Sequence, residues 1–113
     1  MSDASRRGRA SRRKGKDAEL EVVHIFRNNG YPYTERTQRG TAQRGDLAKG
    51  PKATLIEIRR RENLPVAASM REVIARAEPH ELPLLVHRPS RCPWLVTLEL
   101  TELLALLQLR ETA

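Results

Sequence analysis

Two carboxylates, Asp46 and Glu57, are the residues of this chain best placed to do chemistry. Asp46 ends a short polar segment, and Glu57 lies inside the apolar run at residues 53–58. Because side chains alternate between the faces of a strand, Glu57 would share a face with Leu55 and Arg59. A carboxylate in such a strand is unfavourable to bury unless it is paired or binds a cation. Two carboxylates brought together bind a hard cation such as Mg²⁺, so the pattern indicates either a phosphodiester-cleaving site or a solvated strand face.

The pattern of apolar and turn residues predicts the elements that would hold these acids. We expect helices at residues 16–29, 64–77 and 101–109, and strands at residues 31–37, 46–48, 53–60, 82–87 and 94–98. This order predicts an α/β sandwich with a mixed sheet. Thr101 would cap the last helix. That helix is rich in leucine on most sides, so we expect it either to be enclosed in the core or to form a dimer.

The composition limits the class of protein. A chain of 113 residues is long enough for one domain, and its single cysteine excludes an internal disulfide framework. We therefore expect a reducing, cytoplasmic setting. No apolar run approaches the ~20 residues that span a bilayer, so we expect no membrane partner.

The positive charge is concentrated at the N-terminus. Residues 1–16 have a net charge of +6, and the rest of the chain adds +1 to give the total of +7. We expect residues 1–15 to be a basic disordered arm and residues 16–113 to be a single domain. Such an arm gains affinity for a polyanion by releasing counterions, although it could also be a solubilising tail. The basic residues expected to contact DNA there are Arg6, Arg7, Arg9, Arg12, Arg13, Lys14 and Lys16.

Several short motifs occur together in one order. They are the segment 14–20 leading a helix that ends at Gly30, the pair Gly40-Thr41, the pair Gly45-Asp46, the segment 56–62 and the segment 93–96. In this order the chain resembles the PD-(D/E)XK nucleases, most closely their small Holliday-junction resolvase branch, over residues 14–107. The resemblance implies a restriction-endonuclease-like αβββαβ core, with a mixed central sheet flanked by helices. It also implies a homodimeric, Mg²⁺-dependent endonuclease that cuts four-way DNA junctions.

The resemblance assigns roles to individual residues. Asp46, Glu57 and the Ile58 carbonyl would bind Mg²⁺, for which Mn²⁺ should substitute, and Glu19 would assist from the first helix. Glu19 and Glu21 lie about 200° apart around a helix, so only one of them can face the site. The resemblance favours Glu19, because its distance to Gly30 fits the family pattern. Mg²⁺ needs few protein ligands, since it retains water and takes phosphate oxygens.

Two positions depart from the family pattern. Gly45 stands where the family has proline, and we treat this as a permissive exchange. Arg59 stands at the third catalytic position, where the family has lysine. Arginine can stabilise negative charge but cannot deprotonate water, because it stays protonated at any working pH. We therefore expect either an enzyme that relies on metal to activate water or a weakened enzyme.

Further basic and hydroxyl residues surround the acids along the chain. We expect DNA contacts from Arg36, Arg39, Thr41, Arg44, Arg60 and Arg61. Three alternatives to junction resolution stay open. They are another nicking, repair or restriction nuclease with the same core, a nucleic-acid-binding protein that has lost catalysis, and a basic RNA-associated protein with solvated acids.

Overall fold

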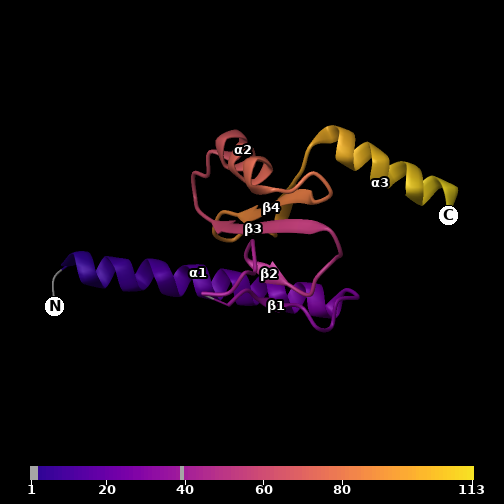
Figure 1. Ribbon diagram of the computed structural model, residues 1–113. Helices are drawn as coiled ribbons and strands as arrows, with labels where there is room; N and C mark the ends of the chain where they lie inside the picture. The colour runs from indigo at the N-terminus through magenta and orange to yellow at the C-terminus, as the bar shows by residue number, and fades with distance from the viewer. Residues whose placement is uncertain (1–2, 39) are drawn as a thin grey trace.

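The computed structural model describes residues 3–38 and 40–113, with side chains from residue 6 onward (Figure 1). Its elements, in chain order, are α1 (Asp3–Asn28), β1 (Glu35–Arg36), β2 (Leu47–Ala48), β3 (Thr54–Arg60), α2 (Val66–Arg76), β4 (Leu82–Arg88), β5 (Leu95–Thr97) and α3 (Leu100–Thr112). The chain is therefore α/β, as the sequence predicts. In these ranges no helix has both the length and the apolar character needed to cross a membrane.

The central sheet is mixed and has the strand order β3-β4-β5. β3 and β4 are parallel, with Glu57 opposite Leu85, whereas β4 and β5 are antiparallel. β1 and β2 form a separate antiparallel pair. The backbone N–H of Asp46 donates to the Ile56 carbonyl at 2.8 Å and thereby links this pair to β3. The prediction of a mixed sheet is confirmed, and the small second sheet is an addition to it.

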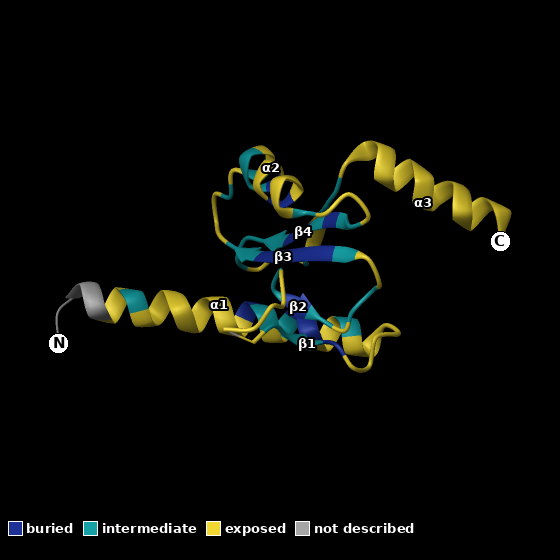
Figure 2. Cartoon of the chain, viewed as in Figure 1, coloured by how far each residue is buried: buried dark blue, intermediate teal, exposed yellow. Residues whose placement is uncertain are grey.

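The two faces of the central sheet are covered by different helices, so the core has two parts. One part joins α1 to the sheet and consists of Ala18, Val22, Val23, Leu47, Ile56, Ile58 and Val86. The other joins α2 to the sheet and consists of Leu55, Met70, Val73 and Leu85. The side chains of β3 therefore alternate between the helices as predicted, and Figure 2 shows β3 and β4 as the buried centre.

The first helix begins at Asp3 and not at Lys16. Residues 3–15, which we predicted to be disordered, are helical, and α1 runs through residue 15 without a break. The prediction of disorder was wrong because it assumed that a segment without packing residues cannot be ordered. A helix that is already held by the buried residues Ala18 and Val22 can add further turns without packing, since elongation is much easier than nucleation. Arginine, lysine and alanine are also good helix formers.

The strand predicted at residues 31–37 is reduced to Glu35–Arg36. Before it, the Thr34 N–H donates to the Tyr31 carbonyl at 3.2 Å and closes a turn. The Thr34 side chain is fully buried, and its hydroxyl donates to the Lys49 carbonyl at 3.3 Å. The turn is thus anchored to the segment after β2, which excludes an extended conformation there.

The last helix lies outside the core. It begins at Leu100 with Glu99 as its N-terminal cap, so the predicted Thr101 cap is wrong, and none of its residues is buried. The alternative in which the core encloses this helix is therefore also wrong. Figures 1 and 2 show α3 extending from the sheet as an exposed rod. Its exposed leucines are Leu100, Leu103, Leu104, Leu106, Leu107 and Leu109.

Candidate functional site

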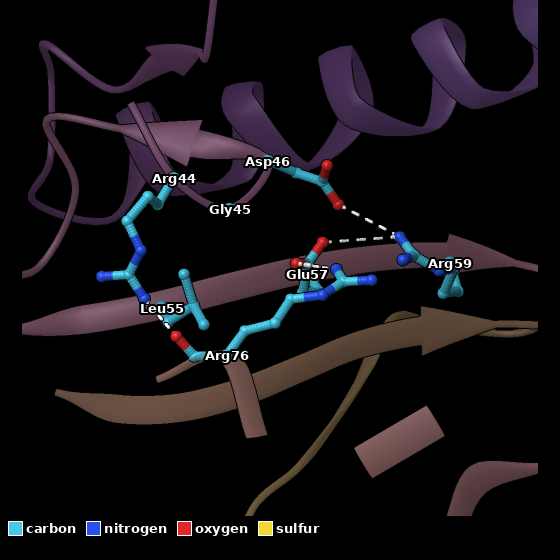
Figure 3. A pocket seen from close by; sticks show the side chains of 7 residues that line it. All are labelled: Arg44, Gly45, Asp46, Leu55, Glu57, Arg59 and Arg76. Atoms are coloured by element: carbon cyan, nitrogen blue, oxygen red, sulfur yellow. Dashed lines mark hydrogen bonds and ion pairs between the residues drawn. The ribbon is translucent and has the colours of Figure 1, made fainter. Parts of the chain in front are cut away.

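The two predicted acids face one cavity. Asp46 lies directly before β2, and Glu57 lies in the middle of β3. The cavity has a volume of about 490 Å³ and is open to solvent. Its lining residues, drawn in Figure 3, are Arg44, Gly45, Asp46, Leu55, Glu57, Arg59 and Arg76. The fold therefore brings together two carboxylates and three guanidinium groups.

Gly45 fixes the position of Asp46. Its φ of 71° lies in the left-handed region, which a side chain disfavours. A Cβ at this position would lie 2.9 Å from the Ile56 carbonyl oxygen and 3.1 Å from Leu55 Cδ1. The glycine thus allows the segment before β2 to approach β3 closely. A proline cannot adopt this φ, so the exchange of the family's proline for glycine goes with the backbone conformation of this segment.

A single nitrogen atom lies among the three oxygens expected to bind metal. Arg59 Nη1 donates to the Ile58 carbonyl at 2.7 Å and to Asp46 Oδ2 at 3.2 Å. The same nitrogen lies 3.6 Å from Glu57 Oε2. Asp46 Oδ2 also accepts the Ile58 N–H at 2.7 Å, which holds the carboxylate against β3. Asp46, Glu57 and the Ile58 carbonyl thus converge on one position that holds a positive group.

Arg76 is a site residue that the sequence analysis missed. It belongs to the last turn of α2, and its Nη1 donates to Glu57 Oε1 at 2.7 Å. The hydrogen bond to Glu57 raises the pKa of Arg76 further above its ordinary value. The guanidinium of Arg44 donates to the Arg76 carbonyl and pairs with Glu81 at 2.6 Å. A basic residue in the last turn of a helix was the only available signal, and the helix dipole explains it equally well.

Glu19 lies beside this cavity on α1. Its carboxylate is half-buried and accepts a hydrogen bond from Arg36 Nε at 2.6 Å. It lines one cleft with Asp46 and a second cleft with Arg59. Glu21 instead points away from these clefts and binds Arg88 at 2.9 Å. The two acids therefore diverge around the helix, with Glu19 on the side of the site.

The Asp46 carboxyl is difficult to ionise. Burial, which removes water from the carboxylate, raises its pKa to about 7. The N–H of Ile58 acts in the opposite direction, and the negative charge of Glu57 raises the pKa again. A cation placed between the two acids would relieve this repulsion.

Basic residues of α1, of β1 and of the end of β3 line the clefts next to Glu19. Lys14, Arg60 and Arg61 lie in the cleft with Arg59, whereas Arg12, Lys16 and Arg36 lie in the cleft with Asp46. Exposed arginines continue along α1 toward its N-terminus, at Arg6, Arg7, Arg9 and Arg13. The structure therefore places basic residues in both clefts and around the projecting half of α1, and these residues together are called the basic band.

The loop before Asp46 shows a different arrangement. The hydroxyl of Thr41 donates to the Gln38 carbonyl at 2.7 Å and accepts the Gln43 N–H at 3.3 Å. Thr41 therefore shapes the loop, and it lines neither cleft. Arg44 points into the cavity beside Arg76. Arg39 lies outside the described residues.

The donor set fits a hard divalent cation. Carboxylate and carbonyl oxygens are the ligands that Mg²⁺ prefers, and Mg²⁺ fills its remaining positions with water. Among the described residues, no group of three or more His, Cys, Asp or Glu side chains could hold a metal ion. The residues that could hold such a cation are Asp46, Glu57 and the Ile58 carbonyl, and binding would require Arg59 to turn outward from its present position among them.

No protein-family model matches the chain, and neither a curated protein nor a solved structure does. The arrangement of residues around the cavity is thus the basis for a functional proposal.

The substitution Gly45→Ala should lower the free energy of unfolding by about 1–3 kcal/mol, because the new Cβ meets the Ile56 carbonyl and φ is positive. Chemical denaturation would measure this change. Gly40→Ala is the matched control, since Gly40 has a φ of 75° but open space around it. An equal loss in both variants would contradict a role for the close approach to β3.

The folded protein should lose stability as the pH rises from about 4 to about 7. The pKa of Asp46 is about 7 in the folded state and 3.8 by default, so the folded state binds the proton more tightly in this interval. Each unit of difference between the two pKa values corresponds to a loss of about 1.4 kcal/mol in the free energy of unfolding. Denaturation of the metal-free protein at several pH values would measure the loss. Asp46→Asn should show a smaller decline, and an identical decline would exclude Asp46 as its source.

Proposed function

We propose that this chain is a metal-dependent endonuclease that hydrolyses phosphodiester bonds in DNA. The observation that carries the proposal is the convergence of Asp46, Glu57 and the Ile58 carbonyl on one cationic position. Bound Mg²⁺ or Mn²⁺ would neutralise phosphate oxygens and lower the pKa of water. The same three groups are those assigned to metal by the resemblance to PD-(D/E)XK nucleases.

The arrangement of the elements supports a PD-(D/E)XK-type core. α1 and α2 cover opposite faces of the mixed sheet, and the parallel pair β3–β4 follows the short strands β1 and β2. The link from Asp46 to Ile56 places β2 at the free edge of β3. This is the order expected for an αβββαβ core, although the two sheets are joined by little hydrogen bonding.

The remaining site residues have roles that follow from their contacts. Arg76 holds one oxygen of Glu57, and the other oxygen faces Arg59 Nη1 at 3.6 Å. Arg59 stays charged and, when turned outward, can donate to a phosphate oxygen in a charge-assisted bond. Neither arginine can accept a proton from water. Glu19, which Arg36 orients, is the carboxylate left to position a water at the edge of the site.

The basic band on α1 supports a polyanionic substrate. It continues from the clefts along the projecting half of α1. One DNA strand could therefore contact the clefts and this part of the helix together. A four-way junction is the substrate that the family resemblance favours, because converging phosphates would meet this band beside the acids. RNA would meet the same charges, and a competition with four-way DNA separates the two.

One observation favours a second function. Arg59 Nη1 already lies where a cation would bind, so the arginine could replace the metal permanently. The protein would then bind nucleic acid without cutting it. The two functions differ in whether a divalent metal can displace Arg59, whose side chain is 36% exposed and therefore has room to turn outward.

Cleavage of a labelled four-way junction in Mg²⁺ or Mn²⁺ tests the first function. We expect paired symmetric cuts that disappear in EDTA and fall by more than about 100-fold in Asp46→Asn, because a metal ligand is lost. Duplex and flap substrates are the controls for selectivity. Tight junction binding without cuts in either metal would instead establish the second function.

Removal of Arg59 should strengthen metal binding. Arg59→Gln takes the competing charge from Asp46 and Glu57, so the affinity for Mn²⁺ should rise roughly tenfold. Titration calorimetry of the DNA-free protein would measure it, and Arg61→Gln is the control because Arg61 is exposed beside the same strand. Arg59→Lys should cut junctions at least as fast as the parent. Unchanged Mn²⁺ affinity in Arg59→Gln would contradict the competition.

A further inference from the structure

The helix α3 presents apolar side chains to solvent on two faces. Leu100, Leu103, Leu104 and Leu107 follow the spacing i, i+3, i+4 and i+7 and therefore lie on one face. Leu106 and Leu109 lie on the other side of the helix, in the same exposed state. Exposed leucine is unfavourable in water by an amount proportional to its area. A helix with this pattern requires a partner surface.

An apolar groove lies elsewhere on the same chain, between α1 and the edge strand β5. It is almost free of polar surface, and its lining residues are Val22, Ile25, Phe26, Leu84, Val86, Trp94, Leu95 and Val96. Three of them are strongly exposed, namely Ile25 at 42%, Leu95 at 52% and Val96 at 53%. The groove is the part of the sheet face that α1 leaves uncovered, which is where a further helix would pack.

The exposed area of the chain is larger than that of a compact monomer. A folded chain of 12.9 kDa is expected to expose about 6,300 Å², whereas this chain exposes 8232 Å². The excess of about 1,900 Å² belongs mainly to the projecting half of α1 and to α3 (Figure 2). A standard interface needs about 800 Å² from each partner. The excess is larger than the area that one partner of a standard interface contributes, and the exposed leucines of α3 account for part of it.

We propose that two copies of this chain exchange α3, each helix packing its Leu100–Leu107 face into the groove of the other copy. A two-fold dimer uses the same pair of surfaces twice and leaves neither exposed. It also brings the second face, Leu106 and Leu109, toward the other copy. The exchange does not rest on the proposed nuclease function. It is tested by the mass of the protein in solution and by disulfide cross-links between chains.

The short connection to α3 favours a second copy over the chain's own groove. Only Leu98 and Glu99 separate β5 from α3, and Glu99 is extended, with a φ of −67° and a ψ of 140°. A return onto a groove lined by Leu95 and Val96 would need a complete reversal in these two residues. The helix instead leaves the sheet directly, as Figure 1 shows.

The first experiment measures mass in solution by light scattering during size-exclusion chromatography. The parent should have twice the mass of 12.9 kDa, and Leu103→Glu/Leu107→Glu should be monomeric with unchanged circular dichroism, since both side chains are exposed. Gln108→Glu is the matched control and should remain dimeric. Because each copy carries +7, added salt should strengthen the dimer. A monomeric parent, or a dimer that persists in the double variant, would overturn the proposal.

Cross-linking then identifies the groove and does not depend on destabilising variants. In a Cys92→Ser background, a tagged chain with Leu104→Cys is mixed with an untagged chain carrying Ile25→Cys. Oxidation should give a disulfide between the tagged and untagged chains. A chain with both substitutions that cross-links only within itself, or Leu104→Cys chains that pair only with each other, would overturn the exchange.

Discussion

The burial of Glu57 in the middle of β3 is the constraint on which the candidate site depends. This residue is only 4% exposed, and an unpaired charge there would be unfavourable by several kcal/mol. β3 cannot move aside, because it pairs with β4 along its length and packs against helices on both faces. The negative charge is therefore met by two guanidinium groups, Arg59 of the same strand and Arg76 from outside it. Arg76 comes from α2, and the contact also ties the end of that helix to the sheet.

Asp46 is also a carboxylate removed from water, but different contacts hold it in place. Its segment is held close to β3 by Gly45, by the hydrogen bond to the Ile56 carbonyl and by the N–H of Ile58. These contacts fix the carboxylate beside Glu57 without removing the repulsion between them, and its pKa therefore stays near 7. Arg59 offsets the repulsion only in part, because one of its nitrogens faces both acids. A divalent cation carries twice the charge of the arginine and would offset it more fully, which is the physical reason for proposing that metal can displace Arg59.

The sequence predicts those features that depend on local pattern. The strand β3, the helix α2 and the strand β4 lie within two residues of their predicted bounds, because apolar periodicity and the flanking prolines define them. It does not predict the contact of Arg76 with Glu57, which joins residues 19 apart in the chain. The helical start of α1 was missed because elongation needs no pattern of its own. The need for glycine at position 45 depends on the Ile56 carbonyl, which only the folded arrangement brings near.

The two projecting helices differ in what they require. The basic half of α1 is stable in water, because lysine and arginine are well hydrated, and it gains from a polyanion only by releasing counterions. The leucines of α3 are unfavourable in water whether or not nucleic acid is present. Self-association through α3 should therefore precede nucleic-acid binding. Salt also acts on the two surfaces in opposite directions, since it screens the repulsion between copies and weakens contacts to phosphate. If both proposals hold, the dimer would be the species that meets nucleic acid, and each nucleic acid would encounter two sets of carboxylates.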